Sequence, residues 1–211
     1  MRITRIENSK HVQERVLVYL EEGDPLRITQ NELLQFGLYQ GMDLSPELVV
    51  QLQNTGKRSE SRAVAARMAS GRMLSRRELT DKLNRKGVDP DTAAETADWL
   101  EALGAVDDTA YAGVIARHYA AGGYGPGRVR QELQKRGIPR ELWDDALSQL
   151  PDSAEAIDRF LHKKLGGRAP DRAMLKKLSD ALLRRGFSWN DIRPALNRLG
   201  GEIEAEKRGD L

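Results

Sequence analysis

The sequence contains no cysteine among its 211 residues. Disulfides, thiolate zinc sites, cysteine-held iron-sulfur clusters and cysteine nucleophiles are therefore excluded together. A chain without cysteine suits a reducing compartment, and its N-terminus lacks the apolar stretch of a signal peptide, so we expect a cytoplasmic protein. No run approaches the roughly 18 apolar residues of a membrane span, so we expect no membrane partner.

Aromatic residues are also scarce, at 5% of the chain, and long apolar runs are missing, although 39% of the residues are hydrophobic. Such a composition can bury cores, but these cores must be aliphatic and small. Several modest modules therefore fit the composition better than one thick domain.

The residues of familiar catalytic sites are likewise missing. The three histidines, His11, His118 and His162, are far apart and form no metal-binding spacing. The glycine-rich segment 122–127 lacks the Gly-Lys-Ser/Thr ending of a phosphate-binding loop and follows a predicted helix, so we interpret it as an interhelical turn. Adjacent carboxylates at 107–108 and 144–145 have no evident third partner. We predict no metal site, no cofactor and no enzyme activity.

Charge is nearly balanced overall but is segregated along the chain. There are 34 basic and 32 acidic residues, for a formal net charge of +2. Residues 61–88 hold eight basic and two acidic residues, residues 89–110 hold seven acidic and no basic ones, and residues 158–200 hold eleven basic and four acidic ones. Local fields therefore say more about a partner than the total does.

The first sixty residues are predicted to form a small module of strands and helices. Extended runs at 2–7, 15–20 and 26–29 predict an antiparallel sheet of two or three strands. Residues 30–36 predict one short helix, and Ser45 followed by Pro46 predicts the start of another that ends near Gln53. We expect a linker at 57–60.

Three later segments are similar to one another, at 75–88, 125–138 and 174–187. Each has apolar residues four and eight positions before a glycine, and these glycines are Gly87, Gly137 and Gly186. The pattern predicts a helix with one apolar stripe that ends in a left-handed glycine. A basic pair precedes each glycine, where cations favour the negative end of the helix dipole.

A predicted helix precedes and another follows each of these central helices, so each unit of about 50 residues comprises three helices. We expect the third helices to end near Leu103, Leu150 and Leu199. The predicted fold class is mainly α: three tandem three-helix repeats in an elongated, curved array, with a small N-terminal β-hairpin and helix module. The predicted boundaries are 1–60, 61–105, 106–151, 152–200 and a polar tail at 201–211.

Three stretches, 106–112, 125–138 and 183–192, resemble the RecX family of bacterial regulators of the RecA recombinase, and the likeness covers about residues 61 to 200. This resemblance implies a monomeric, non-catalytic protein of DNA repair, recombination and the SOS response. It also implies binding along the groove of the RecA filament on DNA, with an effect on its growth, stability and ATPase activity. The filament would consist of RecA on single- or double-stranded DNA, and a weak direct contact with DNA is compatible with this role.

The candidate interface consists of exposed basic residues on the central helices, which could face the filament or its DNA. They are Arg76, Arg77, Lys82, Arg85, Lys86, Arg128, Arg130, Lys135, Arg136, Lys176, Lys177, Arg184 and Arg185. The alternative interpretation is a solvated helix face whose cations match the helix dipole. Two other functions stay open: a helical protein that binds DNA directly without RecA, and, far behind, a nuclease or NTPase.

The acidic stretch from Asp89 to Asp108 also has two interpretations. Its ends suit helix N-termini, and its middle could instead contact a basic surface on RecA or on a neighbouring repeat. Trp99, Trp143 and Trp189 follow the repeat glycines at different distances, so we interpret them as packing residues rather than a repeated base-stacking platform. We expect Tyr111 to pack the opening helix of the second repeat.

Overall fold

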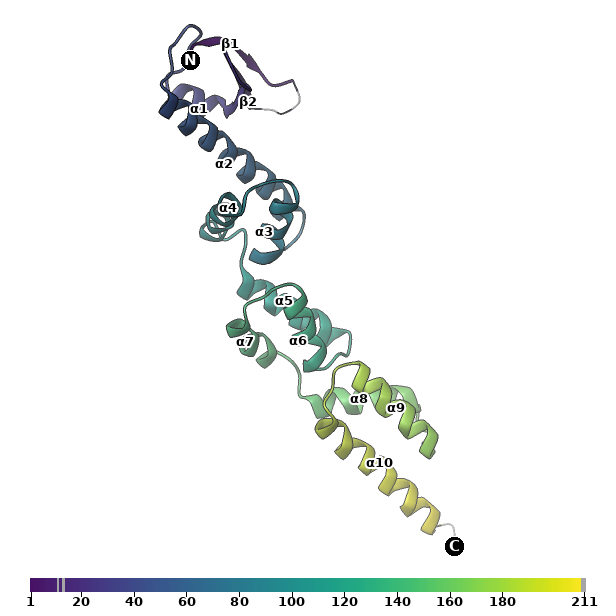
Figure 1. Ribbon diagram of the computed structural model, residues 1–211. Helices are drawn as coiled ribbons and strands as arrows, with labels where there is room; N and C mark the ends of the chain where they lie inside the picture. Colours follow the sequence, from purple (N-terminus) through teal and green to yellow (C-terminus); the bar gives the residue numbers. More distant parts are fainter. Residues whose placement is uncertain (11, 13, 210–211) are drawn as a thin grey trace. The chain divides into compact units, whose positions relative to one another are not determined.

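The computed structural model describes residues 1–10, 12 and 14–209, with side chains through residue 200. Figure 1 shows this part of the chain, which contains three strands, ten α-helices and one short 3-10 helix. The strands are β1 (Ile3–Asn8), β2 (Arg15–Leu20) and β3 (Leu26–Thr29). The helices are α1 (Gln30–Gln35), α2 (Pro46–Gly71), α3 (Arg76–Arg85), α4 (Pro90–Ala102), α5 (Asp108–Ala121), α6 (Pro126–Lys135), η1 (Arg140–Leu142), α7 (Trp143–Ser148), α8 (Ser153–Leu165), α9 (Arg172–Arg184) and α10 (Trp189–Gly209).

The chain divides into two compact units. The first unit comprises residues 1–73 and 79–106, and the second comprises residues 74–78 and everything from residue 107 onward. The first turn of α3 therefore belongs to the second unit, whereas the rest of that helix belongs to the first.

The first unit begins with the predicted antiparallel sheet, which has three strands in the order β1-β2-β3. Alternate residues of the strands, such as Ile3, Val16, Val18 and Ile28, are almost fully buried and pack with Leu52 of α2. Alternation arises because successive side chains of a strand point to opposite faces. Helix α2 thus covers one face of a sheet too small to be stable alone.

Helix α2 is continuous from Pro46 to Gly71, so two sequence-based expectations are wrong: a helix end near Gln53 and a linker at 57–60. The helix passes through Gly56, although glycine is unfavourable inside helices. A β-carbon on Gly56 would lie 2.2 Å from the Arg27 carbonyl oxygen of β3. Glycine therefore lets α2 approach the sheet closely, and the helix continues through it.

The three central helices α3, α6 and α9 end in the same way, as the repeat predicted. Gly87, Gly137 and Gly186 have φ values of 87°, 70° and 88°. The residue after each glycine donates its N–H to a carbonyl of the last turn, at 3.2, 3.0 and 3.2 Å respectively. This is the Schellman ending, which satisfies carbonyls that have no partner within the helix.

The second unit contains two complete three-helix repeats. Helices α5, α6 and α7 share an aliphatic core that includes Val129 and Leu133, and α8, α9 and α10 share another that includes Ile157 and Leu182. Helix α10 runs to Gly209, beyond the expected end near Leu199. Residues 202–208 are mostly Glu, Ala, Lys and Arg, which favour helix, and they carry no proline to stop it.

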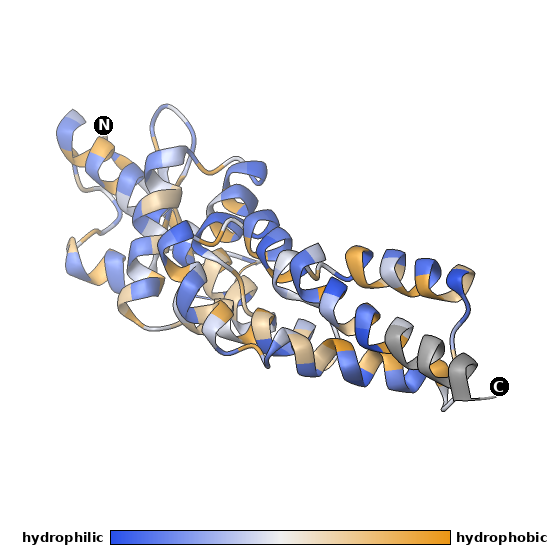
Figure 2. Cartoon of the chain, turned by 90° about the horizontal axis from the view of Figure 1, so that it is seen from below, coloured by the Kyte–Doolittle hydropathy of each residue, from blue (hydrophilic) through white to orange (hydrophobic). Residues whose placement is uncertain are grey.

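Hydrophobic and hydrophilic residues alternate along the helices, and no helix in Figure 2 is hydrophobic throughout. Among the described residues, no helix has the length and apolarity needed to span a membrane. The predicted fold class is confirmed in its helical content, its three-helix repeats and its small N-terminal antiparallel sheet.

Candidate functional site

The thirteen candidate basic residues do not share one environment. Eight are exposed: Arg77, Arg85, Lys86, Arg130, Lys135, Lys176, Lys177 and Arg184. Five are half-buried, so the expectation that all are exposed is wrong for Arg76, Lys82, Arg128, Arg136 and Arg185. The main reason is visible in the second unit, where the start of one central helix packs on the end of the next.

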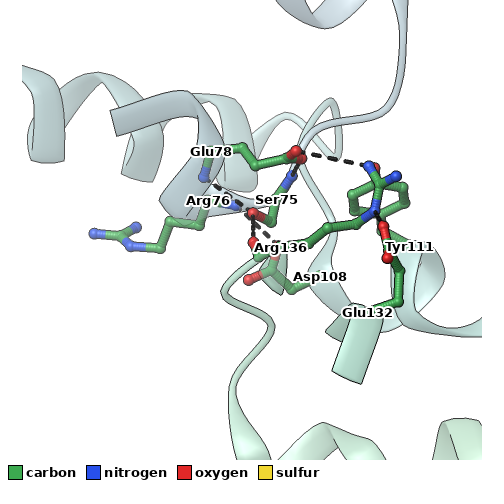
Figure 3. A network of polar contacts seen from close by, with 7 residues as sticks. All are labelled: Ser75, Arg76, Glu78, Asp108, Tyr111, Glu132 and Arg136. Carbon is green, nitrogen blue, oxygen red and sulfur yellow. Dashed lines mark hydrogen bonds and ion pairs between the residues drawn. The ribbon is translucent and has the colours of Figure 1, made fainter. Parts of the chain in front are cut away.

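The clearest of these packed sites surrounds Arg136, at the end of α6 (Figure 3). Its Nε donates a hydrogen bond to Glu132 Oε1 at 2.9 Å, and its Nη1 donates to the Tyr111 hydroxyl. Nη1 also lies 3.6 Å from a carboxylate oxygen of Glu78, in the first turn of α3. Arg136 therefore joins α5, α6 and the 74–78 segment through one planar cation.

Hydrogen bonds from the 74–78 segment also fix the backbone around Arg136. The Ser75 hydroxyl donates to the Arg136 carbonyl oxygen, and the Arg76 N–H donates to Asp108 Oδ1 at 2.9 Å. Ser75 and Glu78 also form a reciprocal capping box, with N–H to side-chain distances of 3.2 and 3.0 Å. In Figure 3 the Arg76 guanidinium points away from the other labelled side chains.

The charges in this cluster stabilise each other. Burial acts to raise the pKa of Glu132, but hydrogen bonds from Tyr119 and Arg136 outweigh it and hold that pKa below its ordinary value. Burial acts to lower the pKa of Arg136, yet its contacts with Tyr111, Glu132 and Glu78 raise it. Both groups are therefore charged at neutral pH, although Glu132 is only 5% exposed.

Arg185 occupies the corresponding position of the third repeat, and its side chain also contacts the preceding repeat. Its Nη1 donates to the carbonyl oxygens of Gly122 and Gly123, each at 3.0 Å. Its guanidinium lies over the rings of Phe160 and Tyr124, 4.9 and 5.3 Å from their centroids. Arg185, like Arg136, is thus a packing residue between successive helices of the second unit.

The first member of each basic pair behaves differently. Arg85, Lys135 and Arg184 each lie two positions before a repeat glycine, and all three are exposed. Each sits in the last turn of its helix. The three repeats therefore present one cation each at the same register position. Lys86, which corresponds to Arg136 in the first repeat, is also exposed.

The acidic stretch is used largely for helix starts. Asp89 Oδ1 accepts the Thr92 N–H and Asp107 Oδ1 accepts the Ala110 N–H, both at 2.9 Å. The bond from the Thr92 N–H lowers the pKa of Asp89. In its middle, Glu95 forms an ion pair of 3.0 Å with Arg58 of α2. A contact of this stretch with a partner stays a prediction.

Most of the aromatic residues singled out in the sequence pack within the fold, and one is exposed. Tyr111 is buried in the core of the second repeat, as predicted. Trp143 donates its Nε1–H to the Ile138 carbonyl oxygen at 3.0 Å, and Trp99 lies under the Arg62 guanidinium. Trp189 differs from the expected packing role, because it is 51% exposed.

Ser75, Glu78 and Glu132 are site residues that the sequence reasoning missed. The available signal was the Ser-x-x-Glu spacing of 75 and 78, which marks a capping box. Within the described residues, no cluster of three or more His, Asp or Glu side chains could hold a metal ion.

The fold and this repeated packing define the class: the chain is a tandem three-helix repeat protein. Family models for the first, second and third three-helix domains of RecX match residues 62–100, 107–147 and 152–196. The chain belongs to the RecX family of regulatory proteins.

Relatives and solved structures agree with this assignment. The regulatory protein RecX of Bacillus licheniformis is 30% identical over 220 residues, which cover 99% of this chain and 84% of the relative. That of Streptococcus gordonii is 28% identical over 215 residues, covering 100% and 82%. A crystal structure of regulatory protein RecX shares the fold with a TM-score of 0.70 at 24% identity, over 91% of this chain and 97% of the other.

Proposed function

We propose that this protein is a non-catalytic regulator that binds along the RecA filament on DNA and alters its growth, stability and ATPase activity. Membership of a family of regulatory proteins supports the regulatory role. The observation that carries the mode of binding is the recurrence of one exposed cation at the same position of three successive repeats, Arg85, Lys135 and Arg184.

A recurring cation suits a partner that is itself a polymer with recurring charge. Three modest contacts made by one chain act together, because the first raises the effective concentration of the others. Where such cations meet phosphates, counterions are released and affinity falls steeply with salt. The exposed neighbours Arg77, Arg130, Lys176 and Lys177 extend this set, whereas Arg136 and Arg185 are already used within the fold.

The test compares charge reversals that are matched in position. Arg184→Glu should weaken binding to RecA filaments on single-stranded DNA by about threefold to tenfold, and the Arg85→Glu, Lys135→Glu, Arg184→Glu triple variant by more than a hundredfold. Lys164→Glu is the control, because Lys164 is also exposed and also lies in the last turn of a helix, α8. The readouts are filament co-sedimentation and RecA ATPase activity at low and physiological salt.

The same series separates the alternatives. If the wild-type protein neither co-sediments with RecA filaments nor changes RecA ATPase activity, a role with RecA is refuted. Tight, salt-sensitive DNA binding without RecA would instead favour the direct DNA binder. Equal losses in Arg184→Glu and in Lys164→Glu, which change the net charge equally, would show that net charge alone, and not the repeated register, matters.

A further inference from the structure

The three glycine-ended turns of the repeats have the same backbone but different surroundings. A β-carbon on Gly137 would lie 2.2 Å from Arg77 Cδ, and one on Gly186 would lie 2.2 Å from the Arg128 backbone nitrogen. A β-carbon on Gly87 would meet nothing within 4 Å. The turns of the second and third repeats are therefore covered, and the turn of the first repeat is open.

In both covered turns, the covering element is the first turn of a helix. The Ser75 hydroxyl, at the start of α3, donates to the carbonyl oxygen of Arg136, the residue before Gly137. At the third repeat, the N–H of Gly125, at the start of α6, donates to the Arg185 carbonyl oxygen at 2.9 Å. Each turn thus takes a helix start whose first residue is small and offers a hydrogen-bond donor.

At the turn of the second repeat, the covering helix also brings an acidic residue to the basic one. Glu78, three residues after Ser75, lies 3.6 Å from Arg136. Lys86 is the residue at this position in the first repeat, directly before Gly87, and its side chain is exposed. The open turn therefore offers an exposed counterpart of the Arg136 cation.

Beside the open turn, within the first unit, lies a cavity of about 370 Å³. We name it the Gly87 groove. It is lined by Lys57, Glu60, Ser61 and Val64 of α2, by Lys86, Gly87, Val88 and Asp89 of the turn, and by Thr92 of α4. Two of these side chains are already used, since Ser61 bonds Thr96 at 2.8 Å and Asp89 caps α4.

We propose that the Gly87 groove binds the first turn of an α-helix of a partner protein, and that this partner is a RecA subunit. The recognised helix begins with a Ser, Thr or Gly cap and carries an acidic residue three positions later. Its cap donates to the Lys86 carbonyl oxygen, its backbone packs on Gly87, and its carboxylate pairs with Lys86. The identity of the partner rests on the proposed function. The small cap of the recognised helix rests on both covered turns, and its acidic residue rests on the turn of the second repeat.

The first experiment fills the groove. Val64→Phe should weaken co-sedimentation with RecA filaments on single-stranded DNA at least tenfold, because the ring occupies the space of the incoming helix. Val50→Phe is the matched control, since Val50 lies on the same helix, is 54% exposed and does not line the groove. Lys86→Glu tests the pairing without a change in the packing, with Lys164→Glu as its charge control, and should also weaken binding at least tenfold.

The second experiment identifies the occupant. Since the chain has no cysteine, Lys86→Cys gives a single attachment point for a benzophenone maleimide. On filaments, photo-crosslinking should join position 86 to the first two turns of a RecA helix. Crosslinks to a second copy of this chain, or to other parts of RecA, would overturn the proposal.

Failure of this proposal can be told from failure of the proposed function. If the wild-type protein does not sediment with filaments, both the function and this partner are wrong. If it sediments, and Val64→Phe and Lys86→Glu sediment equally well, the filament role stands and the groove proposal is overturned.

Discussion

Replacing Arg136 by methionine tests whether its contacts stabilise the second unit. Methionine keeps much of the aliphatic packing but removes the partner of Glu132, which is 5% exposed. Hydrogen bonds to charged groups contribute about 1.5–3 kcal/mol, and breaking a fully buried ion pair costs about 3–5 kcal/mol. Arg136 is 28% exposed and Glu132 keeps the Tyr119 hydroxyl, so we expect a loss of about 2–3 kcal/mol.

The loss should depend on pH in a defined direction. The folded pKa of Glu132 lies below its ordinary value, so the stability from its charged form is complete above about pH 4.3 and declines as pH falls through the folded pKa. Without Arg136, burial acts with less opposition and the pKa of Glu132 should rise. The difference in stability between the wild-type protein and the variant should therefore shrink as pH falls from about 6 to about 3.

The assay is urea unfolding followed by the fluorescence of Trp143, which packs against the core of the second repeat. Trp99→Phe and Trp189→Phe leave it as the single tryptophan reporter. The Arg136→Met, Glu132→Met double variant should recover much of the loss, because removing both partners leaves no buried unpaired charge. A loss below about 0.5 kcal/mol, or one that does not vary with pH, would refute the reasoning.

Two further substitutions have matched controls in the chain. Gly56→Ala should destabilise the first unit by about 1–3 kcal/mol, because the added β-carbon would meet the Arg27 carbonyl oxygen. Gly71→Ala, in the same helix, places its β-carbon in open space and should be neutral or slightly stabilising. Thermal unfolding followed by circular dichroism measures both variants. Arg185→Met should destabilise the second unit by about 1–2 kcal/mol, because it removes two hydrogen bonds to carbonyl oxygens. Arg184→Met is the control: Arg184 is exposed, so this change should alter stability by less than about 0.5 kcal/mol. The urea assay with Trp143 measures the Arg185 and Arg184 variants, and equal effects within either pair would contradict the assigned roles.

The repeats could be predicted because their signals are local. An apolar residue four and eight positions before a glycine fixes both the buried stripe of a helix and its left-handed end. Gly87, Gly137 and Gly186 therefore appear in the structure as the sequence predicted. The antiparallel sheet followed from equally local alternation in its strands.

What the sequence could not reveal depended on contacts between distant residues. Gly56 is a typical helix breaker by propensity, and only the nearby Arg27 carbonyl explains why it lies inside a helix. Arg184 and Arg185 are adjacent and chemically identical, yet one is exposed and the other reaches two carbonyls more than sixty residues away in the chain. The sequence therefore predicted the set of basic residues, but not which of them are exposed and which pack within the fold.

The unbroken course of α2 has a consequence for dissecting this protein into parts. Its 26 residues make a rod of about 39 Å that is both the cover of the N-terminal sheet and the opening helix of the first repeat. A truncation before Ser61 would cut this rod near its middle, next to the buried bond between Ser61 and Thr96. Shortened chains should instead begin ahead of Ser45, since a deletion at residue 60 would confuse loss of a module with damage to its neighbour.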